Sequence, residues 1–517
     1  MGMTLSSRSR SSFIAGIAML ALVVPTMSTA HAATLAAKPA KPVRGGTLTV
    51  GVAGGGSTDT LDAHSPANEA DIARVFALNE SLAGYDANHK IVMKLAKAIS
   101  SNANATIWTV TLRKGLRFSN GKPITAANIV STLKRIVTDK KASATSLVDV
   151  DWTNTRAVTP LTAIVALKNP NSTFIDTLAG YAVGIVPANY NPKKPVGAGP
   201  FKYVSFTPGQ QSVFVRNPYF YLKGKPYIDK LIIRNFADDN ARINALLSNQ
   251  VDAVTSVPVS MLPSITGAGK KVLESVTGAW HPFTMRVDKP PFDDVRVRQA
   301  FRLIINRPQM IQQVLGGHGT LGNDLYAPLD QCYNKSLPQR SQDIAQAKAL
   351  LAAAGKSNLT VDLTTSAGIS GTAVQEAQVF AQQAKEAGVT VNLKILDSNT
   401  YWGGYLSYPF SQSFWYTRDF LPQTEAGSLP TAPYNETNWA DPTFISLVKQ
   451  ARAAGSIAQR CRLIQQAQKI EYDNGGLIIW GFLDQTDAYN AKVQGLRPDK
   501  SGVPLMQFGF DSLWIKK

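Results

Sequence analysis

Residues 195–254 read PVGAGPFKYVSFTPGQQSVFVRNPYFYLKGKPYIDKLIIRNFADDNARINALLSNQVDAV, and this stretch is the most informative part of the chain. Within it, residues 201–206 and 212–216 alternate apolar and polar side chains, as strands with one buried face do. The two runs flank Pro208 and Gly209, a pair that is typical of turns. The sequence therefore predicts a β-hairpin at this point.

The same stretch continues with a second strand and a helix. Residues 227–236 (YIDKLIIRNF) predict the strand, after an Asn-Pro pair that interrupts the chain. Asp239 is placed to cap the helix that follows. The expected apolar face of that helix consists of Ile243, Leu246 and Leu247.

A second ordered stretch covers residues 95–135, LAKAISSNANATIWTVTLRKGLRFSNGKPITAANIVSTLKR. Its middle alternates, with Trp108, Val110 and Leu112 on one face of a predicted strand. After an Asn-Gly turn, Thr125 is placed to cap a helix. That helix is expected to bury a stripe formed by Ile129, Leu133 and Ile136.

A third stretch begins at Lys289 and reads KPPFDDVRVRQAFRLIINRPQMIQQVLGGHG. Asp294 and Asn306 are each placed to cap a helix, and Pro308 falls in the first turn of the second helix, where it costs no hydrogen bond. Helices and strands then alternate, which favours partly parallel sheets. The expected elements are helices at 344–354 and 374–387 and strands at 359–365 and 390–396.

The order and spacing of these stretches resemble those of the large extracytoplasmic solute-binding proteins of ABC importers, the peptide/nickel-binding family or family 5. The matching pieces of the first stretch are VGAGPFKY, RNPYFY, GKPYIDK and ARINALLSNQVDAV. The resemblance implies an α/β fold: a two-lobed periplasmic binding protein of type II, similar to cluster C proteins, with mixed sheets, a hinge and an extra accessory subdomain. It also implies a solute that is captured between the lobes by hinge closure and passed to the transmembrane subunits of an ABC permease.

The resemblance also implies domain boundaries. The first lobe is expected to be discontinuous, and it would contain residues 45–76, 195–282 and 485–517. The accessory subdomain of this lobe is expected at 77–194, and the second lobe at 283–484. The crossovers between the lobes are expected near 283–287 and 480–484, and the protein is expected to be a monomer.

The N-terminus predicts secretion independently of the resemblance. Arg8 and Arg10 precede an apolar run at 13–24, and Ala30-His31-Ala32 offers a cleavage site, as in a signal peptide over residues 1–32. Residues 33–44 are rich in Ala, Pro and Lys and predict a flexible lead-in. Since no cysteine lies near the cleavage site, we expect a periplasmic protein without a lipid anchor.

The charge balance and the cysteines limit the function further. The formal net charge is +18, but the basic residues are scattered and no RNA-binding signature occurs, so we expect no nucleic-acid partner. The two cysteines, Cys332 and Cys461, are expected to pair in an oxidising compartment, although two lone thiols are the alternative. Without a C-x-x-C pair or a histidine cluster, the sequence favours neither a metal site nor a cofactor.

The candidate ligand site is the aromatic-rich stretch 401–419, YWGGYLSYPFSQSFWYTRD. An aromatic cluster with one acid and one base suits a cleft that holds an amphipathic solute. The resemblance implies that Trp415 forms a cleft wall and that Asp419 pairs with the α-ammonium group of a peptide. The predicted contact residues are Tyr401, Trp402, Phe414, Trp415, Tyr416, Arg418, Asp419 and, in a later polar loop, Asn435.

Several alternatives remain open for this stretch. Aromatic runs are commonly core, Asp419 could simply cap a turn, and turn formation would explain Asn435 equally well. Arg418 stands where related proteins commonly have a small residue, and it could either neutralise Asp419 or bind a ligand carboxylate.

Enzyme signatures are absent from the sequence. Neither H-E-x-x-H nor G-x-S-x-G occurs, and the G-x-G-x-x-G at 317–322 follows a helix instead of a strand. We therefore expect no catalytic residues and rank a secreted hydrolase last. The first hypothesis is a peptide-binding component of an importer. The second keeps the fold and changes the ligand to an opine, an amino-acid conjugate, a sugar or a metal chelate such as nickel, which is disfavoured because 401–419 holds no histidine.

Overall fold

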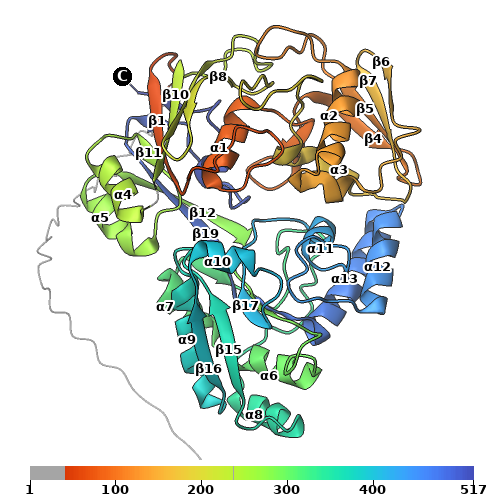
Figure 1. Ribbon diagram of the computed structural model, residues 1–517, viewed down its shortest axis with the longest axis vertical. Helices are drawn as coiled ribbons and strands as arrows, with labels where there is room; N and C mark the ends of the chain where they lie inside the picture. The colour runs from red at the N-terminus through yellow and green to blue at the C-terminus, as the bar shows by residue number, and fades with distance from the viewer. Residues whose placement is uncertain (1–40, 237, 517) are drawn as a thin grey trace, which may run out of the picture. The chain divides into compact units, whose positions relative to one another are not determined.

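The computed structural model describes residues 41–236 and 238–516, and Pro42–Lys517 form one compact unit. The expected signal peptide, 1–32, and most of the lead-in, 33–44, lie outside the described residues. The fold is mixed α/β with several sheets, as expected (Figure 1).

The first sheet has eight strands in the order β12-β19-β11-β1-β10-β9-β8, and β14 pairs with β19. It is mixed, because β1 runs parallel to both of its neighbours and the other pairs are antiparallel. Its strands are β1 (Thr47–Ala53), β8 (Phe201–Thr207), β9 (Gln211–Arg216), β10 (Lys230–Phe236), β11 (Ala253–Val254), β12 (Lys271–Ala279), β14 (Gly319–Leu321) and β19 (Gly481–Tyr489). The helices packed on it are α1 (Glu69–Leu78), α4 (Asp239–Leu247) and α5 (Leu262–Gly267), with a short 3-10 helix at Val259–Met261.

The hairpin that the sequence predicts is confirmed as the pair β8 and β9. Gly209 in the connecting turn has a φ of 71°, which is strained for other residues. The helix cap was predicted one residue too late: Asp238, not Asp239, is the N-cap of α4, and its carboxylate accepts a hydrogen bond from the Ala241 amide at 2.8 Å. Either of two adjacent aspartates can cap a helix, so the sequence does not distinguish them.

The second sheet is antiparallel, in the order β4-β5-β7-β6. Its strand β5 buries Trp108, Val110 and Leu112 on one face, as the alternation predicts. The Thr125 amide donates to the Asn128 side chain at 2.9 Å at the start of α2, which confirms the predicted cap position. The elements of this region are β2 (Ala83–Tyr85), β3 (Ile91–Met93), β4 (Ala96–Ser101), β5 (Ile107–Leu112), β6 (Arg156–Thr159), β7 (Thr162–Ala166), α2 (Ala126–Thr138), α3 (Phe174–Ala179) and the 3-10 helices Ala142–Leu147 and Tyr181–Val183.

The third sheet has the order β16-β15-β17-β13-β18, and its β15 runs parallel to β16 and β17. Its strands are β13 (Phe283–Met285), β15 (Thr360–Thr365), β16 (Thr390–Ile395), β17 (Phe410–Gln412) and β18 (Leu477–Ile478). The helices of this region are α6 (Val295–Ile304), α7 (Arg307–Leu315), α8 (Ile344–Ala353), α9 (Ala373–Glu386), α10 (Ser398–Gly403), α11 (Phe420–Gly427), α12 (Pro442–Ala453) and α13 (Ile457–Asn474). The C-terminal segment adds β20 (Val493–Gln494), α14 (Pro504–Phe508) and β21 (Trp514–Ile515).

Two neighbouring segments connect the first and third sheets. The chain leaves β12 and enters β13 through residues 280–282, and it returns from β18 to β19 through residues 479–480. Because β13 already belongs to the third sheet, the first crossing lies slightly before the expected 283–287. Strand β14, which falls within the range 283–484 expected for the second lobe, pairs with β19 of the first sheet. The lobe boundaries as a set remain a prediction.

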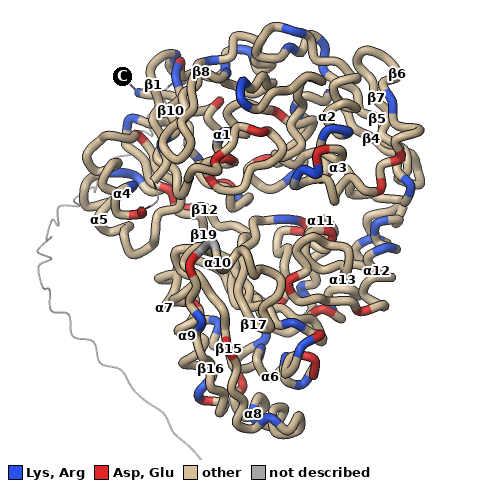
Figure 2. The backbone as a smooth tube through the Cα atoms, viewed as in Figure 1, with Lys and Arg blue, Asp and Glu red and all other residues tan. Residues whose placement is uncertain are grey.

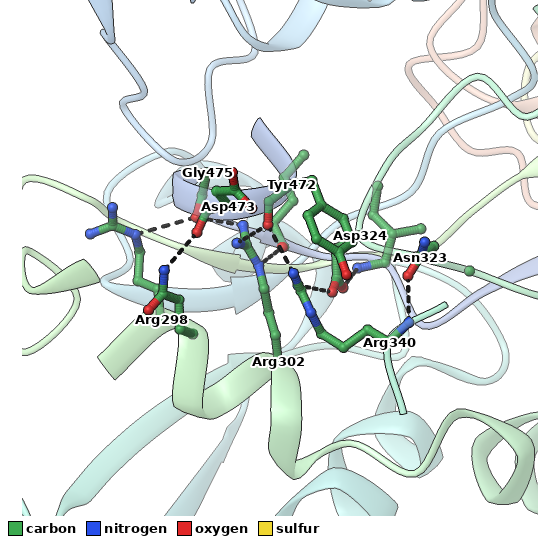
Figure 3. Close-up of polar contacts among 12 residues, drawn as sticks. Arg298, Arg302, Asn323, Asp324, Arg340, Tyr472, Asp473 and Gly475 are labelled. Carbon is green, nitrogen blue, oxygen red and sulfur yellow. Dashed lines mark hydrogen bonds and ion pairs between the residues drawn. The ribbon is translucent and has the colours of Figure 1, made fainter. Parts of the chain in front are cut away.

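A buried arginine cluster holds the return segment in place. Figure 3 shows Arg298 and Arg302 reaching from α6 to the chain at the end of α13, where Arg302 donates to the carbonyl oxygens of Gly475 (2.6 Å) and Tyr472 (2.9 Å). Carbonyl groups at a helix C-terminus lack partners within the helix, so these donors stabilise it. The Asp324 carboxylate accepts hydrogen bonds from Arg340 at 2.7 Å and from the Ile479 amide at 3.0 Å, which ties the return segment, 479–480, to the same cluster.

Cys332 and Cys461 form a disulfide, which attaches the loop before α8 to helix α13. Lys and Arg are spread along the described chain instead of gathering on one element (Figure 2). Among the described residues, no group of three His, Cys, Asp or Glu side chains could hold a metal ion. None of the helices in the described part is both long and apolar enough to cross a membrane.

Candidate functional site

A cavity formed by several separate segments has a volume of about 340 Å³, within the range that is common for small-molecule sites. Segments far apart in the sequence form its wall, including the end of α1, the turn between β2 and β3, helix α3, the segment before α11 and the C-terminal segment. The aromatic and polar side chains used below are Tyr85, His89, Asp176, Tyr416, Arg418 and Gln507.

One side of the cavity is a stacked pair of rings. The rings of Tyr85 and His89 are nearly parallel, with centroids 4.4 Å apart, and the Tyr85 hydroxyl donates to the Asp176 carboxylate at 2.7 Å. Burial raises the pKa of Asp176 to about 6 and lowers the pKa of His89 to about 4. His89 is therefore neutral at pH 7 and only 8% exposed.

Another part of the cavity wall carries a cation. The backbones of Trp415 and Trp280 exchange two hydrogen bonds of 2.9 Å, which anchors the chain just before Tyr416 and Arg418. The Arg418 guanidinium lies 5.1 Å from the centroid of the Trp415 ring and donates to Gln423 at 3.3 Å. No residue that the structure describes forms an ion pair with Arg418.

Asp419 occupies the N-cap position of α11, and its side chain is about one-third exposed. Its Oδ1 lies 3.7 Å from Nε2 of His89, which lines the cavity. Burial and the nearby carboxylates of Asp330 and Asp176 raise the pKa of Asp419 to about 8, and Arg460 opposes this shift. Arg418 does not pair with Asp419 within the described structure, so the base and the acid are separately available to a ligand.

The structure divides the predicted contact residues into two groups. Tyr416 and Arg418 line the cavity, and Asp419 adjoins it through His89. Trp415 is 7% exposed and stacks on Trp280, so it supports this wall from behind.

The remaining predicted residues lie outside the cavity wall. Tyr401 is fully buried and its hydroxyl donates to the Gln412 carbonyl, so it takes the core role that the sequence left open. Trp402 and Phe414 pack edge to face against each other. The Asn435 amide donates to the carbonyls of Leu429 and Trp439, at 3.1 and 2.9 Å, and thus closes a turn. These four residues do not line the cavity in this structure.

The C-terminal segment contributes a strained turn to the wall. Leu505, Met506, Gln507 and Phe508 all have φ between 48° and 61°, a left-handed turn that is costly for residues other than glycine. The Gln507 amide donates to Asp499 at 2.8 Å and to the Tyr85 carbonyl at 3.4 Å. This turn thus holds the Tyr85 and His89 side of the cavity in place.

No signal in the sequence points to Tyr85, His89, Asp176 or Gln507, because each comes from a segment distant from 401–419. The histidines lie in different segments, so no sequence pattern distinguishes His89 from the others. Alternation and capping signals describe local structure, and these four residues meet only through the tertiary fold.

A set of polar contacts joins the region of the second sheet to helices α12 and α13. Arg452 of α12 donates to Asp149 at 3.1 Å and lies 3.0 Å from Glu425, an ion pair without hydrogen-bond geometry. The Ser172 amide donates to the Arg452 carbonyl at 2.8 Å, and Arg460 donates to the Ser172 hydroxyl at 3.0 Å. These contacts tie the region of the second sheet to helices α12 and α13.

One group of residues has the composition of a hydrolase relay but not its geometry. Both Glu376, at 2.8 Å, and Ser370, at 3.4 Å, approach the same Nδ1 atom of His281. In a relay the acid and the nucleophile bind different ring nitrogens. This arrangement gives no support to the hydrolase hypothesis.

Comparison with known proteins identifies the family. The model of the bacterial extracellular solute-binding proteins, family 5 middle region, matches residues 90–431. The glutathione-binding protein GsiB of Pectobacterium atrosepticum is 28% identical over 359 residues, which are 66% of this chain and 67% of that protein.

Solved structures show the same fold. The PBP AgaA from A. tumefaciens R10, in complex with agropinic acid, gives a TM-score of 0.80 at 24% identity, covering 91% of this chain and 99% of that chain. The oligopeptide-binding protein AppA of Bacillus subtilis, in complex with a nonapeptide, gives 0.77 at 20% identity, covering 92% and 100%. The chain therefore belongs to the bacterial extracellular solute-binding proteins of family 5, the binding components of ABC importers.

Proposed function

We propose that this chain captures short peptides with a free amino terminus in the cavity beside His89 and Arg418 and delivers them to an ABC permease. The carrying observation is a cation, Arg418, and a carboxylate, Asp419, that do not neutralise each other. A zwitterionic solute matches this pair, because its carboxylate meets Arg418 and its ammonium group favours the ionised form of Asp419, whose pKa burial has raised. The glutathione-binding relatives and the nonapeptide complex of AppA support a peptide ligand.

The proposed mechanism is closure around the ligand. Tyr85 and His89 belong to one side of the cavity and Tyr416 and Arg418 to the other, with the two crossing segments, 280–282 and 479–480, as the hinge. A ligand that contacts both sides favours the closed form, and one that contacts a single side does not. The protein acts by binding, without catalysis, as a periplasmic monomer that carries no lipid anchor.

The apolar part of the wall suits peptide side chains. Phe76, Tyr181, Pro422 and Val503 line it together with Tyr416. Apolar contact is tolerant of side-chain shape, whereas the charged groups select the ends of the ligand. We therefore expect a permissive site for short peptides of varied sequence.

A second candidate is a non-peptide zwitterion such as an opine or an amino-acid conjugate. Arg418 favours it, because its guanidinium suits a carboxylate group and forms no ion pair with any described residue, and AgaA, which has the same fold, was solved in complex with agropinic acid. A neutral sugar has no charged group to pair with Arg418 or Asp419, so these residues do not favour it. The position of His89 close to Asp419 favours a nickel chelate, because imidazole is a nickel ligand. Against it, the described residues contain no group of three His, Cys, Asp or Glu side chains that could hold a metal ion.

Native mass spectrometry of protein purified from a periplasmic extract tests the proposal. After release of the bound material, a heterogeneous set of short peptides supports peptide uptake. A single non-peptide mass supports the second candidate, and turnover of the released compound by the purified protein would contradict a pure binding role.

A further inference from the structure

His89 is a buried polar side chain in the cavity wall whose hydrogen-bonding capacity the protein does not use. Its side chain is 4% exposed, and neither ring nitrogen has a hydrogen-bond partner among the residues that the structure describes. Buried polar groups are nearly always hydrogen-bonded, so such a residue calls for an explanation. A neutral imidazole offers one donor and one acceptor, which fits a polar ligand group.

The local structure holds this imidazole in one orientation. His89 has a φ of 62° in the turn between β2 and β3, and the Asp86 carboxylate accepts hydrogen bonds from the Asn88 and Lys90 amides, each at 2.9 Å. The ring stacks on Tyr85, whose hydroxyl is bonded to Asp176. A strained backbone held by several contacts is typical of functional positions.

A neighbouring carboxylate indicates which ligand group His89 binds. Its Nε2 lies 3.7 Å from Oδ1 of Asp419, too far for a direct hydrogen bond. With the ring proton on Nδ1, Nε2 is an acceptor. The Asp419 carboxyl becomes an ionised acceptor when a ligand ammonium group beside it lowers the pKa that burial has raised. A primary ammonium group has three N–H donors and can bond to both atoms at once.

We infer that His89 is a specificity-determining residue that accepts a hydrogen bond, at Nε2, from the same primary ammonium group of the ligand that Asp419 binds. The inference rests on the proposed function, since it takes Asp419 as the amine contact. The site thereby selects unsubstituted amines: acylation removes the charge and two of the donors, and a quaternary ammonium has no N–H.

The test compares two matched tripeptide libraries, one with free amino termini and one N-acetylated, by native mass spectrometry and then by calorimetry with the tightest peptide. His89→Phe keeps the stacking on Tyr85 and removes both nitrogens. His89→Asn is a second variant, because asparagine tolerates the positive φ. Asn88→Ala in the same turn is the control, since Asn88 is exposed and only its backbone amide bonds to Asp86.

We expect free-amine peptides to bind the wild type and acetylated peptides not to bind. Both His89 variants should weaken binding about tenfold or more, the usual effect of losing a hydrogen bond to a charged group, while Asn88→Ala leaves it unchanged. Combined with Asp419→Asn, the loss should be smaller than the sum of the single effects, because both residues bind one group.

Two results would overturn the inference, and they are distinguishable. If both folded His89 variants bind like the wild type while Asp419→Asn does not, His89 is no contact and the proposed function stands. If the wild type binds no free-amine peptide, the proposed function fails and the inference fails with it.

Discussion

The contact between Asp149 and Arg452 should contribute to ligand affinity although neither residue lines the cavity. Asp149 precedes β6 of the second sheet and Arg452 lies in α12, so hinge opening would separate them. Asp149→Asn removes this ion pair and leaves Arg452 paired with Glu425 at 3.0 Å. The closed form then loses a contact that the open form never had.

The magnitude follows from the burial of the pair. The side chains are 24% and 19% exposed, and the Nη2–Oδ2 distance is 3.1 Å, so the pair is expected to contribute about 1 kcal/mol, near the upper end for partly exposed ion pairs. If this energy is present only in the closed form, the dissociation constant rises about fivefold. Calorimetry with a bound peptide measures the change, and stopped-flow fluorescence should assign it to faster dissociation.

The matched control is Asp473→Asn, which removes the exposed Lys469–Asp473 pair within helix α13. That pair does not join the two sides of the cavity, so its loss should leave affinity unchanged. High salt should also reduce the difference between Asp149→Asn and the wild type, because salt screens exposed charges. If Asp149→Asn lowers the melting temperature but not the affinity, the contact is structural and the reasoning is wrong.

Three further predictions concern stability. The pKa of Asp419 in the folded protein is raised to about 8, so the folded protein binds more protons than the unfolded chain between about pH 4 and 8. The free energy of unfolding should therefore fall as the pH rises through this window. The melting temperature of ligand-free Asp419→Asn should increasingly exceed that of the wild type toward pH 8, and a constant difference would contradict the pKa shift. Lys140 follows α2 with a φ of 50°, where glycine is preferred, and the backbone amide of Lys141 donates to the Ile136 carbonyl as in a Schellman motif. Lys140→Gly should therefore raise the free energy of unfolding in urea by about 1 kcal/mol. Lys140→Ala should give no such gain. The disulfide closes a loop with a sequence separation of 129, so Cys332→Ser with Cys461→Ser should cost about 5 kcal/mol on the chain-entropy model; an unchanged denaturation midpoint would refute it.

Local signals in the sequence predict the elements that surround the cavity. The alternation in 201–216 gives the hairpin β8–β9, and Thr125, Asp294 and Asn306 stand at the starts of α2, α6 and α7. Such signals depend on neighbouring residues alone, because side chains alternate along a strand and capping groups bond within one turn. The resemblance between three such stretches and one family then predicts the fold class.

The sequence leaves structure and role unassigned where local signals are short or shared. Strand β14 has three residues, too few for a pattern to predict it or to assign it to a sheet. Tyr401 and Tyr416 stand in one aromatic run, yet the first is fully buried and the second lines the cavity. Aromatic side chains serve cores and binding sites equally well, so composition cannot separate the two roles.

The order of elements, the capped helices, the family and the segment that carries Tyr416, Arg418 and Asp419 can be read from the sequence alone. The position of His89 beside Asp419, the hydrogen bond from Arg418 to Gln423 and the left-handed turn that supports the cavity wall follow from the tertiary structure. Periodicity and capping arise between residues that are close in the chain. A binding site arises between residues that only the packing of separate sheets brings together.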